Sequence, residues 1–253
     1  QTDDLREVAI AVGMRVVRPG TVEILADGCD GTARVRVQGD LVVFPTLQEA
    51  LEAEDPQVTV EHEYVLRAGS AAIEIRTTLK PLADATEVLV ADVLFWGGEV
   101  AMYLPGHGDA NLPVTTNAAT VGLTARRLLG ATTADATAYA FAAKDKLLTV
   151  DAGAIHAFLH GNVLVDKGGL TLVRHLAAGR DLAAAMAAAR TAAGTAEPTR
   201  RVAGKVAGTG PAVVVEALDA AGKPLTRCAT DAEGRFDCPV PLATAGLAAG
   251  WIG

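Results

Sequence analysis

The sequence lacks several features that would assign it to a large functional class. Its 22 lysines and arginines are outnumbered by 30 aspartates and glutamates, and no basic cluster offsets the formal net charge of −8. Nucleic-acid binding depends on a concentrated set of cations that neutralise phosphates, so we expect no nucleic-acid partner. The apolar runs also fall short of the roughly 18 residues that a membrane-spanning helix needs. We therefore expect no transmembrane segment.

Catalytic and cofactor motifs are missing as well. The chain has no Gly-x-Ser-x-Gly, no phosphate-binding glycine loop, no Cys-x-x-Cys pair and no dinucleotide-binding glycine fingerprint. His156 and His160 have the spacing of zinc ligands on a helix, but their neighbours predict a strand. On a strand the two histidines would lie about 13 Å apart, too far for one ion. The sequence predicts no cofactor, no metal site and no catalytic residue.

Aromatic residues are scarce, at 4% of the 253 residues, although half of the chain is hydrophobic. Its core must therefore consist mainly of alanine, valine and leucine. Residues 58–67 and 71–79 alternate apolar and polar side chains around a turn at 68–70, which predicts two antiparallel strands. Further strands are predicted at 21–26, 33–37, 41–44, 87–96, 137–141, 146–150, 161–165 and 170–176. So many short strands with Gly and Asp turns predict an all-β antiparallel sandwich.

One segment predicts a helix instead. Residues 179–194 are rich in alanine, contain an acid near their start and end near a glycine. Leu182 and Met186 would lie on the buried side of this helix. The polar, proline-containing segment that follows is typical of a linker, so we place a domain boundary near residue 197. The predicted domains are residues 1–197 and 198–253.

Two of the three cysteines, Cys228 and Cys238, flank a turn with a glycine near its end. In a hairpin with the three-residue loop 232–234, the two would lie directly opposite each other and could form a disulfide. The alternative is a pair of buried thiols on one face of a sheet. A disulfide implies an oxidising compartment, and the polar start of the chain fits a mature protein whose leader has been removed. We expect a periplasmic or extracellular protein.

The segment 92–108 combines Trp96, Tyr103 and His107 with two adjacent glycines and a Pro-Gly corner. The glycines predict a structural turn, with Gly106 in the left-handed position that a type II turn requires. The competing interpretation is a ligand site, in which the aromatic side chains and His107 border a concave, sugar-binding face of the sandwich. The sequence favours the turn and leaves these three residues as candidate ligand contacts.

Two polar residues interrupt otherwise apolar strand faces. His62 lies between Val60 and Tyr64, and Arg174 lies between Leu172 and Leu176. A buried arginine needs an acidic partner, and Glu61, Glu63 or Glu74 of the predicted hairpin could serve. The alternative, which the sequence favours, is that each strand passes from the core to an exposed edge at this point.

The C-terminal segments "VAGKV", "VVVEALDAAGKPL" and "TDAEGRFDCPV" resemble the carboxypeptidase regulatory-like, or transthyretin-like, family. The resemblance implies a small β-sandwich in which Asp231 caps a turn, Gly234 is left-handed and Phe236 points into the core. The segment is shorter than the whole family domain, so we expect a partial module.

The earlier order of "VTVEHEYVLRAGSAAIEIRTTLKPL", "VADVLFWGG", "YLPGHG" and "LTLVRHLAAGRDLAAAMAAA" resembles the accessory domain that precedes the catalytic part of some bacterial PHP-type metallohydrolases. This resemblance implies a galactose mutarotase-like supersandwich. The His-x-His motif of the PHP part is absent from the chain. We therefore expect a non-catalytic accessory region of an exported protein. It would recognise a carbohydrate or another cell-envelope ligand, or support a metallohydrolase domain that follows it.

The alternative is a sugar-active enzyme, an epimerase or lyase of the same supersandwich type. A mutarotase-like reaction needs a histidine acid and a carboxylate base around one sugar. The chain contains both residue types, but their spacing along the sequence does not pair them.

Overall fold

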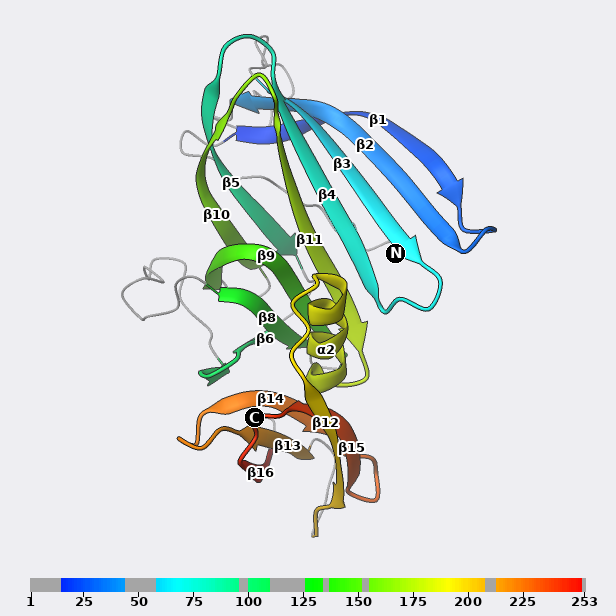
Figure 1. Cartoon of the computed structure of the whole chain (residues 1–253), viewed down its shortest axis with the longest axis vertical. Helices are drawn as coiled ribbons and strands as arrows, with labels where there is room; N and C mark the ends of the chain where they lie inside the picture. Colours follow the sequence, from blue (N-terminus) through cyan, green and yellow to red (C-terminus); the bar gives the residue numbers. More distant parts are fainter. Residues whose placement is uncertain are drawn as a thin grey trace. The chain divides into compact units, whose positions relative to one another are not determined.

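The computed structural model describes residues 15–43, 58–95, 100–109, 126–133, 137–151, 155–207 and 213–251, and nearly all of its elements are β-strands (Figure 1). Within these residues, the strand pairs with a defined register are all antiparallel. The predicted all-β antiparallel fold is therefore confirmed. In the same ranges, no helix has the length and apolar composition that a membrane crossing requires.

The chain divides into two compact units. The first comprises residues 1–97, 112–126 and 145–174, and the second comprises residues 98–111, 127–144 and 175–253. The boundary predicted near residue 197 lies inside the second unit. It stays a prediction, because a small module can form part of a larger compact unit.

The first unit contains a run of four antiparallel strands that are consecutive in the chain. The turn at 68–70 joins two of them, and Gly69 adopts the positive φ of 74° that this turn needs. Two further strands of the unit pair with each other, and their register spans residues 86–95 and 155–165. In chain order these strands are β1 (Arg15–Asp27), β2 (Thr32–Val43), β3 (Val58–Arg67), β4 (Ala72–Pro81), β5 (Thr86–Phe95) and β10 (Ile155–Val165).

The core of the first unit follows from the period of two in these strands. In β3, Val58 and Val60 are buried while Thr59 between them is half-buried. The aliphatic cluster to which they belong also contains Leu41, Leu79, Val88, Val90, Val165 and Leu172. It contains no aromatic residue, as the composition predicts. Two long strands, β9 (Ala138–Asp151) and β11 (Leu170–Gly179), contribute residues to both units.

The second unit contains the helix and the C-terminal strands. Its strands are β6 (Val100–Leu104), β7 (Gly108–Asp109), most of β8 (Arg126–Thr133), β12 (Thr199–Lys205), β13 (Val213–Leu218), β14 (Pro224–Ala229), β15 (Arg235–Pro241) and β16 (Gly246–Trp251). The last five form two small sheets, one of β12 and β15 and the other in the order β14-β13-β16.

The predicted helix is present as α2 (Leu182–Ala192). It begins after Asp181, whose carboxylate accepts a hydrogen bond of 2.8 Å from the backbone N–H of Ala184. Leu182 and Met186 are buried, as predicted. Both contact β8 at Gly130, where a Cβ atom would lie only 2.5 Å from the Leu182 Cδ2 atom. The helix therefore packs closely on the strand because that position has no side chain.

The predicted disulfide between Cys228 and Cys238 is also present, with the two Cα atoms 6.0 Å apart. The hairpin register that suggested it is wrong. Cys228 lies on β14, which pairs with β13, whereas Cys238 lies on β15, which pairs with β12. The bridge therefore joins the two small sheets through their buried faces rather than two neighbouring strands.

The turn between these cysteines forms as expected. Gly234 has a φ of 77°, and the Asp231 carboxylate accepts backbone hydrogen bonds from Glu233 and Arg235. Phe236 is partly buried and packs against the cluster that contains both cysteines. The local chemistry of the turn was thus predictable, but the sheet that each flanking strand joins was not.

Candidate functional site

The last part of the segment that the sequence singled out lies in the second unit and forms a tight hairpin with Asp109. β6 and β7 pair through Tyr103 with Asp109 and Leu104 with Gly108. The backbone N–H of His107 donates to the Leu104 carbonyl at 3.0 Å, and Gly106 has a φ of 80°. The structural-turn interpretation is therefore confirmed for residues 104–108. Trp96 lies outside the described residues.

The two remaining candidates occupy different environments on this hairpin. Tyr103 is fully buried, whereas His107 is exposed. Arg227 of β14 is related to each of them in a different way. The guanidinium carbon of Arg227 lies 5.1 Å from the centre of the Tyr103 ring, a cation–π distance. His107 and Arg227 line the same pocket.

Arg227 holds two carboxylates from different strands. Its two terminal nitrogens donate to the two oxygens of Asp109 at 3.0 and 2.7 Å, which is a bidentate pair. Its Nε and one terminal nitrogen donate to Glu216 Oε1 at 3.3 and 2.8 Å. Glu216 stands directly opposite Arg227 in the β13–β14 register. This pairing fixes the positions of both acids.

The electrostatics of the cluster follow from burial and from these hydrogen bonds. Burial lowers the pKa of Arg227, but the hydrogen bonds to Asp109 and Glu216 outweigh it and leave the pKa raised. Burial, together with the charge of Glu216, raises the pKa of Tyr103 far above its ordinary value. Arg227 is therefore a permanent cation and Tyr103 a neutral phenol. The Tyr103 hydroxyl has no hydrogen-bond partner within the described ranges.

The pocket beside this cluster has a volume of about 310 Å³. Its polar side chains are His107, Asp109, Glu216 and Arg227, and its remaining wall consists of small or apolar residues: Gly108, Val214, Pro224, Ala248, Ala249 and Gly250. The Asp109 side chain is half exposed. One arginine and two carboxylates give the pocket a surplus of hydrogen-bond acceptors, which suits a ligand that offers O–H or N–H donors.

Sequence reasoning missed Asp109, Glu216 and Arg227. A weak signal existed for two of them, because the turn around Gly222 predicts a hairpin that brings β13 and β14 together. No sequence signal connects Asp109 with Arg227, since the two lie 118 positions apart. Asp109 follows a glycine of a turn, but charged residues are common at such positions, so this pattern does not identify Arg227 as its partner.

The first unit contains a second buried arginine, and here the favoured prediction was wrong. Arg174 is 1% exposed and is not at a sheet edge. Its guanidinium donates to both oxygens of Asp92 at 2.7 and 2.5 Å, and to the Thr77 hydroxyl at 2.7 Å. The partner is therefore Asp92 on β5, not a glutamate of the β3–β4 hairpin.

His62 belongs to the same buried group. Its Nδ1 atom lies 2.8 Å from the Thr77 hydroxyl, and the side chain is buried rather than at an exposed edge. Burial, aided by the charge of Arg174, lowers the pKa of His62 to about 4. The histidine is thus neutral at physiological pH. All four side chains of this cluster are buried: His62, Thr77, Asp92 and Arg174.

His156 and His160 both lie on β10, as the strand prediction required. Within the described residues, no group of three or more histidine, cysteine or acidic side chains could hold a metal ion. The absence of a metal site from the whole chain stays a prediction. The candidate functional site is the pocket beside Arg227.

Comparisons with known proteins add little to this geometry. No family model and no curated protein matches the chain. Among the solved structures that resemble it is a GH36 alpha-galactosidase from Geobacillus stearothermophilus in complex with stachyose, with 11% sequence identity and a TM-score of 0.39. The similarity covers 69% of this chain but only 30% of that one.

Proposed function

We propose that the chain is a non-catalytic recognition region that binds a carbohydrate in the pocket beside Arg227. The observation that carries this proposal is the arrangement of Asp109 and Glu216, two carboxylates held by one buried cation at the wall of a small pocket. A carboxylate has about four acceptor positions, and Arg227 uses only some of them. The remaining positions suit the hydroxyl donors of a sugar.

The same contacts favour binding over catalysis. A general base must have an oxygen within reach of the proton that it removes. Both oxygens of Asp109 already accept hydrogen bonds from Arg227, as does one oxygen of Glu216. Carboxylates in this state position a ligand well, because their orientation is fixed before the ligand arrives.

The proposed setting of this region is an exported bacterial protein. The Cys228–Cys238 disulfide supports it, since such bridges persist in oxidising compartments. The sequence resemblance supports an accessory role next to a metallohydrolase domain. In that role the region would hold the catalytic domain near its substrate by binding a carbohydrate or another cell-envelope ligand.

A glycan array followed by calorimetric titration of the best-binding neutral sugar tests the proposal. We expect Asp109→Asn to weaken binding about tenfold or more, because a hydrogen bond to a charged group contributes roughly 1.5–3 kcal/mol. Asp84→Asn, which changes an exposed acid in the first unit, is the matched control and should bind normally. Absence of binding to every glycan, or equal binding by the Asp109 variant, would refute the proposal.

A sugar-active enzyme is the second candidate, because His107 lines the same pocket as the two carboxylates. That pairing of residue types is what proton transfer at a sugar requires. Polarimetry of freshly dissolved galactose distinguishes the two functions. Acceleration of mutarotation that disappears in His107→Ala would establish the enzyme, whereas binding without acceleration would establish the recognition region.

A further inference from the structure

Arg227 offers few hydrogen-bond donors to a ligand, because the chain already uses most of them. Two of its N–H groups donate to Asp109 and two to Glu216. Most of the N–H donors of a guanidinium are then engaged. The guanidinium also lies over the Tyr103 ring, with its central carbon 5.1 Å from the ring centre. A ligand in this pocket therefore meets the oxygens of the two acids rather than a free cation.

The two acids keep oxygens that Arg227 does not use. Both hydrogen bonds from Arg227 to Glu216 go to Oε1, and within the described residues no donor of the chain reaches Oε2. The side chains of Glu216 and Asp109 are 27% and 50% exposed. Two acids and one arginine line the pocket, so with His107 neutral at pH 7 its lining has a net charge of −1. The pocket is rich in acceptors and has one unbalanced negative charge.

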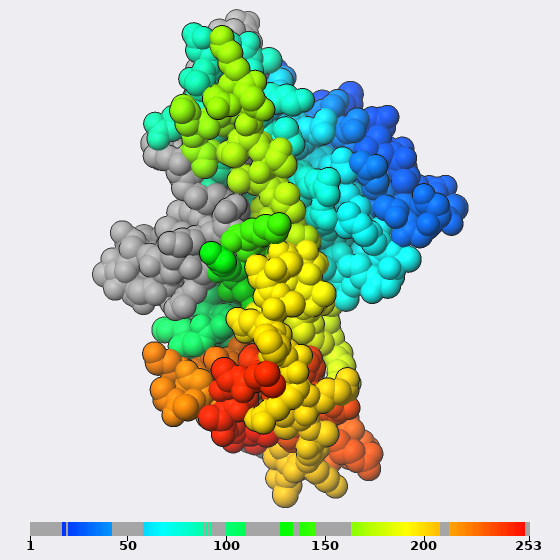
Figure 2. Space-filling model, in the orientation of Figure 1, coloured from blue at the N-terminus to red at the C-terminus, as the bar shows by residue number. Residues whose placement is uncertain are grey.

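The hollow beside Glu216 comes from the small residues of β16. Strand β13 lies between β14 and β16, so Glu216 has Arg227 directly opposite on one side and Ala248 on the other. Val214 lies opposite Gly250, where a Cβ atom would meet nothing within 4 Å. Ala248 and Gly250 are exposed, and residues toward the C-terminus, red in Figure 2, form part of the visible surface. A ligand can therefore approach Glu216 from the side that Arg227 does not occupy.

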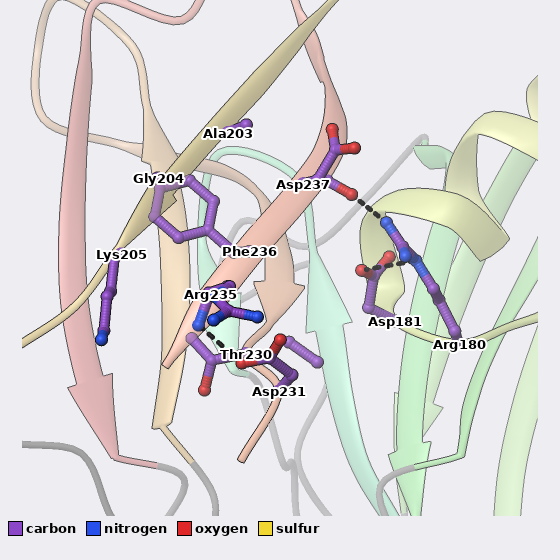
Figure 3. Close-up of a pocket in the computed structure, with 11 residues that line it drawn as sticks. Arg180, Asp181, Ala203, Gly204, Lys205, Thr230, Asp231, Arg235, Phe236 and Asp237 are labelled. Atoms are coloured by element: carbon purple, nitrogen blue, oxygen red, sulfur yellow. Dashed lines mark hydrogen bonds and ion pairs between the residues drawn. The ribbon is translucent and has the colours of Figure 1, made fainter. Parts of the chain in front are cut away.

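The larger pocket of the second unit, of about 710 Å³, has a different charge balance (Figure 3). Three acids and three cations line it, which leaves no net charge: Arg180, Asp181, Lys205, Asp231, Arg235 and Asp237. The Asp237 carboxylate pairs with Arg201, and in Figure 3 the side chains of Lys205 and Arg235 point in different directions. The excess of acceptors is thus a property of the pocket beside Arg227 and not of the C-terminal strands in general.

We propose, building on the carbohydrate-binding function above, that the preferred ligand of the pocket beside Arg227 is an amino sugar with a free, protonated amine. The assignment rests on that function and narrows its ligand to one class of sugar. An ammonium group has only N–H donors and no acceptor, which matches a lining of carboxylate oxygens. Its charge balances the excess carboxylate, and charge-assisted hydrogen bonds are about twice as strong as neutral ones. The amine would donate to Glu216 Oε2, and ring hydroxyls would donate to Asp109.

The test is calorimetric titration of the full chain with glucosamine, N-acetylglucosamine, glucose and ethanolamine at about pH 7, where an amine of this kind is mostly protonated. We expect glucosamine to bind about tenfold or more tightly than N-acetylglucosamine and glucose, which have the same ring without the charge. Ethanolamine has the amine without the ring, so it should also bind about tenfold more weakly than glucosamine. Added salt should reduce the preference for glucosamine, because the extra attraction is ionic.

Two variants separate the charge from the shape of the pocket. Glu216→Gln should bring the affinities for glucosamine and N-acetylglucosamine close together, because it removes the excess negative charge at nearly constant volume. It leaves Arg227 paired with Asp109, so the variant should fold, which its melting temperature checks. Ala248→Leu fills the hollow beside Glu216 without a change of charge and should weaken the binding of both sugars by a similar factor.

The matched control is Glu63→Gln in the first unit. Glu63 Oε1 accepts hydrogen bonds of 3.1 and 2.8 Å from Nε and a terminal nitrogen of Arg34, the same type of contact that Glu216 makes with Arg227. Glu63 does not line the pocket, so the variant should keep the full preference for glucosamine.

The outcomes distinguish the ligand class from the proposed function. Equal binding of glucosamine and glucose would overturn the amine preference and leave carbohydrate binding in place. An unchanged preference in Glu216→Gln, or its loss in Glu63→Gln, would also overturn the assignment of the amine to Glu216. Binding of ethanolamine as tight as that of glucosamine, or no binding of any sugar, would overturn both the amino-sugar assignment and the carbohydrate-binding function.

Discussion

The buried pair of Arg174 and Asp92 allows the sharpest test of the fold. Their side chains are 2% and 3% exposed, so neither charge has access to water. Replacing Asp92 by Asn keeps the side-chain volume but removes the negative charge that Asp92 places against the Arg174 guanidinium. The Thr77 hydroxyl and the Leu172 carbonyl remain as acceptors, but both are neutral. Breaking a buried pair in this way costs about 3–5 kcal/mol of unfolding free energy.

Thermal unfolding measured by differential scanning calorimetry tests this value. For a chain of this length, a loss of about 3–5 kcal/mol lowers the melting temperature of the affected unit by about 6–20 °C. The matched control is Asp40→Asn. Asp40 pairs with Arg18 at 3.2 Å, but the two side chains are 34% and 31% exposed. An exposed pair contributes at most about 1 kcal/mol, so the control should melt close to the parent chain.

A double variant separates the loss of a contact from the burial of an unpaired charge. Asp92→Leu combined with Arg174→Met removes both charges and fills a similar volume. Such replacements are often neutral or stabilising, so the double variant should be more stable than Asp92→Asn. A change of less than about 1 kcal/mol in Asp92→Asn, or no recovery in the double variant, would show that the pair is not desolvated as the structure indicates.

Two further predictions concern pH and redox state. The pKa of His62 falls from 6.5 to about 4 on folding. Its contribution to the free energy of unfolding should therefore be fully present above pH 6.5 and be lost, by up to about 3 kcal/mol, as the pH falls toward 4. Urea unfolding at pH 4.5 and 7.5 measures this decline, and His62→Gln should reduce it; an equal decline in that variant would assign it to other groups. Loss of the bridge in Cys228→Ala/Cys238→Ala should cost about 2–3 kcal/mol on the chain-entropy model, measured by urea unfolding with the reduced parent chain for comparison. Two free thiols in the non-reduced parent, found by mass spectrometry, would contradict the bridge.

Much of the fold could be predicted from the sequence because its signals are local. The alternation in β3 and β4 and the glycine turn between them occupy adjacent residues, so their register follows from the sequence. The start of α2 follows from Asp181 and the alanine-rich run after it. These patterns reflect backbone geometry and one-sided burial, which act over a few residues.

The disulfide shows where local reasoning stops. The bridge was predicted by placing the two cysteines opposite each other in one hairpin, and that register is wrong. Alternation along each strand does place both cysteines on the buried side. It does not specify whether two consecutive strands pair edge to edge or pack face to face in different sheets. In the structure, β15 pairs with β12 instead of β14. The partner of a strand depends on segments far along the chain, which a turn of five residues cannot indicate.

The two buried arginines present the same difficulty and show how a site can be told from a structural pair. Arg174 and Arg227 each hold an aspartate through two hydrogen bonds, across 82 and 118 positions of the sequence. No local pattern identifies either partner. The difference lies in the acid, because the Asp92 side chain is 3% exposed and that of Asp109 is 50% exposed. A sealed pair leaves no acceptor position open to a ligand, whereas a carboxylate that is fixed by a buried cation and still open to a pocket retains acceptor positions for a ligand. Exposure of the acid, rather than burial of the arginine, therefore separates the candidate site from the core.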